Sequence, residues 1–278
     1  MLSPSLPPSS LLHFTLSLTL SLTRSPTFLP FVLLLQPVWH LPRLLAKAAE
    51  ELPAVRMFVD EMAAVNMTRS YLHLHVGLDA TGIDMDALAP HYTVFEKGMV
   101  RAGGGSDGAI TDHVCSEGNM VAVSNVCRLE KELAPEGKIM LHAYMCANEP
   151  YEKWEGQRRG AEYEAMKDKE AEALWSAIER IIPDARERAD VALVGSPLTH
   201  ERFLRRPRGT YGATVESLLR DGSTPIEGLV LCGDSLFPGI GIPAVALSGA
   251  SAANAFVGVR EQLRAYKKEK KPPRKKVK

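Results

Sequence analysis

The sequence predicts a mixed α/β fold whose chemistry lies near the C-terminus. Three features predict it: stretches with a two-residue hydrophobic period, one long stretch with helical period, and a short apolar strand that runs into a Gly-rich turn and a helix. The chain has 278 residues, 45% hydrophobic and 24% charged, which is ordinary globular composition. This composition excludes a wholly disordered chain, a collagen-like fibre and a strongly basic nucleic-acid-binding protein, so no nucleic-acid partner is expected.

The formal net charge of zero is the sum of two unlike parts. Residues 267–278 hold eight basic residues and one acidic residue, so this stretch has a net charge of +7 and the rest of the chain −7. Because it also contains Pro272 and Pro273, we predict a solvated extension and assign residues 259–278 to a basic disordered tail. A solubilising tail is the first interpretation, and a nuclear address or a contact with anionic lipid or nucleic acid is the alternative.

The four cysteines (Cys115, Cys127, Cys146 and Cys232) show neither a CxxC pair nor a Cys/His ligand spacing. We therefore expect no zinc site and no disulfide scaffold, and a reducing compartment is the default.

Residues 1–49 form a Ser/Leu-rich segment in which the first forty residues hold no acid. The apolar run Leu11–Leu22 is shorter than the ~20 residues that a spanning helix needs, and its positive charge, Arg24, follows the run instead of preceding it. Three interpretations stay open: an organelle transit peptide, a secretory or anchor segment, and translated non-coding sequence from a wrong gene model. None of them gives the segment a role in the fold.

The middle of the chain is predicted to contain four strands. Their ranges are Tyr71–Leu78, His91–Glu96, Asn119–Val126 and Lys138–Cys146. In the first and the last, hydrophobic side chains alternate with His73, His75 and His142. If these two strands pair, the three histidines share one face, where a three-histidine metal site is one interpretation. Hydrogen-bonded surface histidines are the commoner outcome, so we expect no metal site.

The clearest predicted helix is Tyr163–Ile182, where apolar residues recur at three- and four-residue steps until Pro183. We interpret it as a packing helix without chemistry. A literal G-x-G-x-x-G pattern lies at Gly103–Gly108, but no helical period follows it. A flexible turn between strands therefore explains it better than a dinucleotide site does.

A strand–turn–helix unit near the C-terminus holds the candidate binding residues. The apolar strand Leu229–Cys232 runs into Gly233 and Asp234, and a helical stretch from about Pro243 to Val257 follows. Gly233 permits a tight bend at the end of the strand. Asp234 is an acid at the carboxyl end of a strand, where α/β folds place ligands and where it can accept hydrogen bonds from sugar-like hydroxyls.

The start of this helix is the candidate anion site. Gly239 and Gly241 let a ligand lie against bare backbone, and Pro243 at the first helical position needs no N–H partner. The N–H groups of Ala244 and Val245 are then expected to point outward, free to bind an anion. A buried strand–turn–helix without a ligand is the alternative.

The segment CGDSLFPGIGIPAVALSG, residues 232–249, resembles the C-terminal flavin-binding motif of carotenoid isomerases and related phytoene-desaturase-type FAD oxidoreductases. Val194–Gly212 (VGSPLTHERFLRRPRGTYG) resembles the family's stretch beside the flavin and the substrate tunnel. Leu133–Gly137, the strand after it and Trp154–Gly156 also have family counterparts in the same order. The resemblance therefore covers roughly Phe58 to Gly258.

The resemblance implies a substrate-domain-like mixed sheet in residues 50–192 and a C-terminal flavin-binding portion in residues 193–258. It implies FAD as cofactor, a lipophilic polyene as substrate, and hydride or electron exchange that gives desaturation or cis–trans isomerisation. The implied flavin contacts are Gly233, Asp234, Gly241, Pro243, Ala244 and Val245, with Asp234 on the ribityl chain. The candidates for lining the tunnel are Thr199, His200, Arg205 and Arg208, of which the arginines also fit a solvated loop, and no catalytic acid or base is assigned.

The chain departs from the family in front of these motifs, where the family has a strand–GxGxxG–helix unit for the ADP half of FAD. The expected fold is thus a partial FAD/NAD(P)-binding two-domain flavoprotein fold without the N-terminal Rossmann βαβ unit. Two functions stay open: a carotenoid isomerase or desaturase with peripheral contact to a plastid membrane, and an inactive fragment or interaction protein that keeps the fold's second half. If the first segment is an artefact, the expected location is cytoplasmic. Ile240 stands where carotenoid isomerases more often have Gln, so the motif does not fix the substrate.

Overall fold

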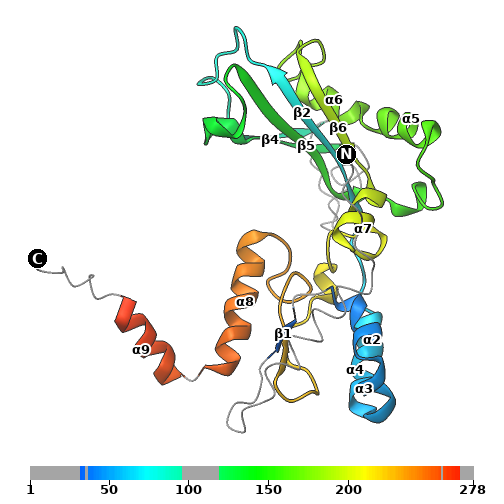
Figure 1. The fold of residues 1–278 in the computed structure, drawn as a ribbon, viewed down its shortest axis with the longest axis vertical. Coiled ribbons are helices and arrows are strands. Elements are labelled where there is room, and N and C mark those ends of the chain that lie inside the picture. Colours follow the sequence, from blue (N-terminus) through cyan, green and yellow to red (C-terminus); the bar gives the residue numbers. More distant parts are fainter. Residues whose placement is uncertain (1–31, 35–36, 96–118, 258, 270–278) are drawn as a thin grey trace, which may run out of the picture. The chain divides into compact units, whose positions relative to one another are not determined.

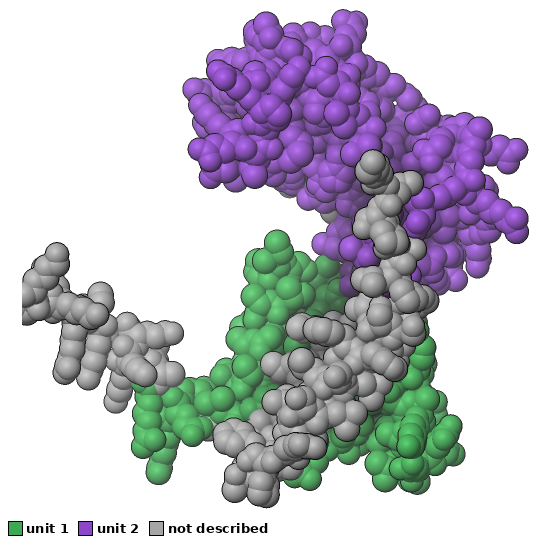
Figure 2. Space-filling view, in the orientation of Figure 1, with its two compact units in different colours: residues 1–66, 212–278 green, residues 67–211 purple. Residues whose placement is uncertain are grey.

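The computed structural model describes residues 32–34, 37–95, 119–257 and 259–269. Its contacts divide the chain into two compact units, which Figure 2 shows in two colours. The sheet unit is residues 67–211, and the helical unit is residues 1–66 together with residues 212–278. This division differs from the expected boundaries after residues 49 and 192, because the helical unit is assembled from two stretches that are distant in sequence.

The sheet unit contains a five-stranded antiparallel sheet with the order β3-β4-β5-β2-β6 (Figure 1). Its strands are β2 (Ser70–Asp79), β3 (His91–Phe95), β4 (Met120–Asn125), β5 (Lys138–Glu149) and β6 (Ala189–Gly195). The first four lie where the sequence predicts strands, two of them from the two-residue period and two from β-branched runs. The mixed α/β class is therefore confirmed, with an antiparallel sheet at its centre.

One face of this sheet is buried under helices α5 (Ala161–Glu170) and α6 (Glu172–Glu179). The alternating residues Leu72, Leu74, Val76 and Leu78 of β2 and Ile139, Leu141, Ala143 and Met145 of β5 are all buried on this side. Leu174 and Ile178 of α6 complete the core with Trp154, whose indole N–H donates to Glu149 Oε1 at 2.6 Å. The expectation of one helix over residues 163–182 is wrong in detail, because the helix is interrupted at Ala171, which lies fully buried.

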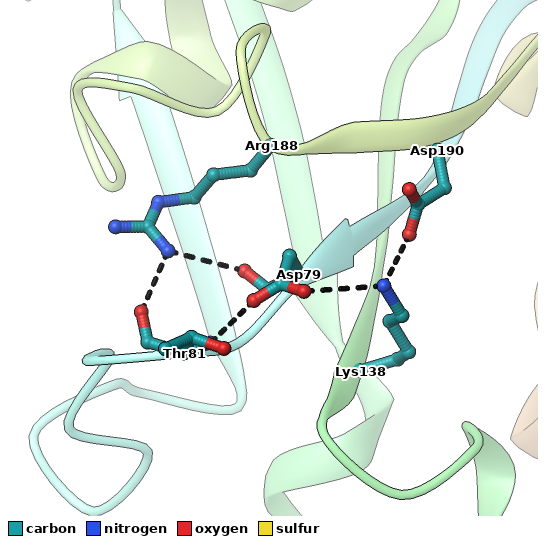
Figure 3. A network of polar contacts seen from close by, with 5 residues as sticks. All are labelled: Asp79, Thr81, Lys138, Arg188 and Asp190. Carbon is teal, nitrogen blue, oxygen red and sulfur yellow. Dashed lines mark hydrogen bonds and ion pairs between the residues drawn. The ribbon is translucent and has the colours of Figure 1, made fainter.

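A polar network fixes the ends of three strands of the sheet unit (Figure 3). Lys138 Nζ lies 3.2 Å from Asp79 Oδ2 and 2.6 Å from Asp190 Oδ2. The guanidinium of Arg188 donates to the carbonyl oxygens of Asp79 and Thr81 at 3.3 and 2.7 Å. Because Asp79 and Lys138 are direct partners in the β2–β5 ladder, this pair also marks the register of the two strands.

The helical unit is formed by helices from both of its stretches and a two-stranded parallel sheet. Its elements are β1 (Val32–Leu34), α2 (Leu41–Leu44), α3 (Ala46–Glu51), α4 (Pro53–Ala63), β7 (Leu229–Leu231), α8 (Ile242–Phe256) and α9 (Val259–Glu269). Val38, Leu41, Val55 and Met62 pack in one core with Leu231 of β7.

Two expectations about the ends of the chain need correction. Residues 32–34 pair with Leu229–Leu231 and residues 38–49 contribute core side chains, so the first segment does have a role in the fold. The expected disordered tail begins instead with the helix α9, because Val259 and Leu263 recur at helical spacing among charged residues. Within the described ranges, no helix has the length and apolar character needed to cross a membrane.

Six short 3₁₀ turns join these elements in the described part of the chain. They are η1 (Val38–His40), η2 (Val126–Arg128), η3 (Lys131–Leu133), η4 (Tyr151–Lys153), η5 (Pro207–Gly209) and η6 (Val215–Ser217). The most consequential is η5, where Gly209 has a φ of +57° and lies buried against helix α7 (Pro197–Leu204).

Candidate functional site

Four histidines gather on the face of the sheet opposite the buried core. His73 and His75 alternate with the core residues of β2, and His142 alternates with those of β5. His75 and His142 are direct partners in the antiparallel ladder, which confirms that the three side chains share a face. His200 of α7 joins them, with its ring 4.6 Å from that of His73. We call these four residues the histidine cluster.

The rings of the three strand histidines lie close and nearly parallel. The centroids of His75 and His142 are 4.1 Å apart with 5° between the planes, and those of His73 and His142 are 4.9 Å apart with 8°. His73 Nδ1 and His142 Nε2 are hydrogen-bonded at 2.6 Å. One of the two imidazoles must donate and the other must accept, so at least one ring nitrogen of the pair carries no proton.

Burial sets the charge state of the cluster. Burial first, and neighbouring basic groups second, lower the pKa of His73 to about 2 and the pKa values of His142 and His200 to about 4. For His73 these neighbours are His200, His142 and His75, whereas for His200 the neighbour is Arg206. Burial alone lowers the pKa of His75. The cluster is therefore a set of neutral imidazoles at neutral pH.

Aromatic and aliphatic side chains surround the cluster. Tyr71 stacks at an angle on His73, with 4.8 Å between the ring centroids, and Tyr144 lies 4.6 Å from His142. On the neighbouring strand β6, Leu193 is the direct partner of His75 and is 62% exposed. Val191 of the same strand is 49% exposed. This side of the sheet is thus lined by imidazole, phenol and aliphatic groups, of which His75, Leu193 and Val191 are exposed.

Two of the four tunnel candidates have clear positions. His200 belongs to the histidine cluster, as described above. Thr199 instead completes a capping box, because its Oγ1 accepts a hydrogen bond from the Ser196 N–H at 3.1 Å at the start of α7. Its methyl group also lies close to Gly195 of β6.

The two arginine candidates do not join the cluster. Arg205 ends α7 in the left-handed conformation, with a φ of +56°, and is exposed. Arg208 makes an ion pair with Glu152 and lies 5.1 Å from the ring of Tyr151. The third arginine of this loop, Arg206, donates to the carbonyl oxygens of Thr210 and Tyr211 at 2.6 and 3.1 Å. These contacts hold the loop together.

In the helical unit the predicted strand–turn–helix is present at the expected residues. Strand β7 ends before Cys232, and Gly233 bends the chain with a φ of +130°. Its N–H donates to Ser248 Oγ of α8 at 3.0 Å, which ties the turn to the helix. Gly241 caps α8 with a φ of +107°, a value that favours glycine.

The helix start differs from the expectation in one respect. α8 begins at Ile242, so Pro243 is its second residue. The N–H of Val245 donates to the Gly241 carbonyl oxygen at 2.9 Å, so the expectation that it is free to bind an anion is wrong. Ile242 and Ala244 supply the N–H groups that precede this first intrahelical bond.

The turn brings together residues that lie far apart in the sequence. A Cβ built on Gly212 would lie 2.7 Å from Ile240 side-chain atoms and 3.7 Å from Asp234 Oδ2. The end of the Val194–Gly212 motif therefore packs directly on the 232–249 motif. Ser235, the next residue after Asp234, is buried, and its Oγ has no hydrogen-bond partner among the described residues.

Sequence reasoning missed Ser235 and the exposed pair Val191 and Leu193. Ser235 directly follows Asp234 in the motif, a position that could have suggested it. The alternation in ADVALVG is the signal for β6, although both of its faces contain apolar residues. The pattern at Gly103–Gly108 and Cys115 lie outside the described residues. Cys127 and Cys232 are both buried free thiols.

No family model matches the chain, whereas several known proteins are similar to part of it. A chloroplastic prolycopene isomerase of Arabidopsis thaliana is 38% identical over 146 residues, which cover 49% of this chain and 24% of that protein. Prolycopene isomerase 2 of an Oncidium hybrid is 31% identical over 66% of this chain and 30% of that protein. The human all-trans-retinol 13,14-reductase is 31% identical over 37% of this chain and 19% of that protein.

By their names, these relatives are isomerases and reductases, so the class that the comparisons support is that of the oxidoreductases and isomerases. Over part of its length the chain is similar to prolycopene isomerases and to retinol reductases, which confirms the resemblance to the carotenoid isomerase family seen in the sequence. It spans about a quarter to a third of the length of the prolycopene isomerases that it matches. A solved oxidoreductase from Methanosarcina mazei aligns with 81% of this chain and 42% of that chain, at 15% identity and a TM-score of 0.41.

Proposed function

We propose that this chain binds FAD and acts on carotenoid-type polyenes as a flavin-dependent oxidoreductase or isomerase. Among these reactions, we propose cis–trans isomerisation ahead of desaturation. The observation that supports this most is the close packing of Gly212, Ile240 and Asp234, which joins the family's two motifs at one point. The alternative of an inactive protein that keeps only the fold predicts the same packing but no retained flavin.

The residues of the turn fit part of the flavin cofactor. The half-buried carboxylate of Asp234 lies at the end of a strand, and the buried Ser235 Oγ has no partner among the described residues. Both groups suit ribityl hydroxyls, which donate and accept hydrogen bonds. The first-turn N–H groups of Ile242 and Ala244 suit a phosphate. We therefore propose Gly233, Asp234, Gly241, Pro243, Ala244 and Val245 as flavin neighbours and add Ser235, while Val245 contributes packing instead of its N–H.

A bound flavin would supply reversible hydride or electron exchange with a conjugated double bond. The chain's own contribution is to orient the flavin and to hold an apolar substrate. The exposed Leu193 and Val191, with Tyr144 and the neutral imidazoles beside them, offer the kind of surface on which an uncharged polyene can lie. The relatives' names support the substrate class, since prolycopene and all-trans-retinol are both conjugated polyenes.

We also propose a plastid location with peripheral membrane contact. The prolycopene isomerases that support this location are named as chloroplastic proteins. Helix α9 supports the contact, because Val259 and Leu263 are 70% and 53% exposed and lie one turn apart in a helix that also contains Arg260 and Arg264. Such basic amphipathic helices bind anionic lipid surfaces.

The proposed activity is tested by supplying the purified full chain with FAD, a chemical reductant and vesicles that contain a cis-configured carotenoid. We expect a protein-dependent change in geometric isomers, measured by chromatography, which slows about tenfold in Asp234→Ala because a charge-assisted hydrogen bond to the flavin is lost. Asp60→Ala, an exposed aspartate of α4, is the matched control and should leave the rate unchanged. Unchanged isomers in the presence of bound flavin would contradict the isomerase assignment, and new desaturated products would favour the desaturase.

A further inference from the structure

Three of the clustered histidines have the arrangement of a metal-binding site. One ring nitrogen from each of His73, His75 and His142 lies within 4.8 Å of the other two. His73 and His75 are two residues apart on β2, and His142 of β5 is directly opposite His75. Their backbone positions are therefore set by the ladder of the central strands, which is a rigid support for a ligand set.

The chemistry of these ligands selects a class of metal. Imidazole nitrogens suit zinc and the neighbouring divalent transition metals, whereas calcium and magnesium prefer oxygen ligands. In proteins, zinc is found bound to three histidines with its fourth coordination position open to a further ligand. His75 is exposed, so this fourth position can be reached from solvent.

Two details of the geometry bear on how a metal would fit. His73 Nε2 is buried and has no hydrogen-bond partner among the described residues, so this ring has a nitrogen that is available to a ligand or to a bridging group. His73 Nδ1 and His142 Nε2 are 2.6 Å apart, whereas two nitrogens on a tetrahedral zinc are about 3.3 Å apart, as follows from bond lengths of about 2.0–2.1 Å. Binding through these two nitrogens therefore requires a small rotation of the rings, which moves the nitrogens apart by less than an ångström.

We propose that His73, His75 and His142 form a binding site for one divalent transition metal ion, with zinc as the preferred metal. The site lies on the face of the sheet unit opposite the core, and none of its residues is among those proposed to contact the flavin. The nearby ring of His200 stands 4.6 Å from that of His73 and is a candidate for a supporting contact.

The test uses the full chain without a polyhistidine tag, freed of metal by a chelator that is then removed. Titration with Co²⁺ alone should give visible absorption typical of a low-coordinate nitrogen site, with one ion per chain, and Zn²⁺ should displace it. His75→Ala should weaken Co²⁺ binding by on the order of tenfold or more. This variant removes an exposed side chain, so circular dichroism should show an unchanged fold.

His91→Ala is the matched control, because His91 is an exposed histidine of the same sheet that contacts Ser124 and lies outside the cluster. The proposal expects His91→Ala to bind Co²⁺ as the unaltered chain does, and His75→Ala combined with His142→Gln to bind none. Equal Co²⁺ binding by the unaltered chain and by this double variant would overturn the site. Absence of any saturable Co²⁺ or Zn²⁺ binding by the folded chain would overturn it too, whether or not the chain retains flavin.

Discussion

His75 of β2 and His142 of β5 lie directly opposite each other, with ring centroids 4.1 Å apart and only 5° between the ring planes. Their pairing depends on the register of the two central strands. Since side chains alternate between the faces, a shift by one residue would move every histidine of β2 into the core and Leu74 out of it. The face that holds the histidine cluster is therefore fixed by the same residues that form the core.

The cross-strand pair Asp79–Lys138 at the end of this ladder should contribute stability that depends on pH. Hydrogen bonds from Thr81 and then from Lys138 hold the pKa of Asp79 at about 2, below its usual value of 3.8. A carboxyl whose pKa is lower in the folded state stabilises the fold above pH 3.8, and this contribution is lost as the pH falls through about 2.

We therefore expect Asp79→Asn to lower the melting temperature at pH 7, with a difference from the unaltered chain that shrinks between about pH 4 and pH 2. Since both partners are partly exposed, the difference should also shrink at high salt. Asp168→Asn, an exposed aspartate of α5, should show neither trend. Melting curves that differ by the same amount at pH 7 and pH 2 would contradict this assignment.

Gly209 should tolerate no side chain. A Cβ there would lie 2.4 Å from the Pro197 carbonyl oxygen and 2.8 Å from Ser70 Oγ. Gly82 has a similar positive φ, +78° against +57°, but open space around its Cα. Both alanine variants carry the cost of a left-handed residue, about 1–2 kcal/mol, so the difference between them reports the collision.

We expect Gly209→Ala to lower the free energy of unfolding by about 1–3 kcal/mol more than Gly82→Ala does. Urea unfolding followed by circular dichroism measures both values. Equal values for the two variants would show that the chain near η5 relaxes away from α7.

The membrane contact proposed for α9 should depend on its apolar side. Leu263→Glu should weaken binding to anionic phospholipid vesicles by about tenfold. Burial of one leucine side chain in the lipid contributes about 1.5 kcal/mol or more to the binding free energy, and the substitution removes this contribution. Leu129→Glu changes a leucine of the sheet unit that is 79% exposed and should bind as the unaltered chain does. Co-sedimentation with vesicles measures both, and an equal loss in the two variants would count against α9.

The sequence allowed prediction of those elements whose burial is one-sided. Leu72, Leu74, Val76 and Leu78 alternate with polar residues, so the period of β2 and the common face of the histidines could be predicted. Strand β6 was not predicted, because as an edge strand it exposes apolar residues such as Leu193. The role of Val32–Leu34 was missed because its partner, Leu229–Leu231, is almost two hundred residues away.

The candidate site divides in the same way. The turn after β7 and the helix after it could be located from Gly233, Asp234 and Pro243, because glycine and proline mark backbone conformations locally. The contact of Gly212 with Ile240 and the buried Oγ of Ser235 depend on packing between segments, which no local pattern encodes. The position of His200 beside His73 depends on where α7 docks, and only the structure supplies it.

The most direct test of the flavin assignment is equilibrium dialysis of the purified full chain against FAD, with retained flavin measured by its absorbance. We expect one flavin per chain, an affinity for FAD about tenfold weaker in Asp234→Ala, and an unchanged affinity in Asp60→Ala. A folded chain that retains no flavin would contradict the flavin assignment.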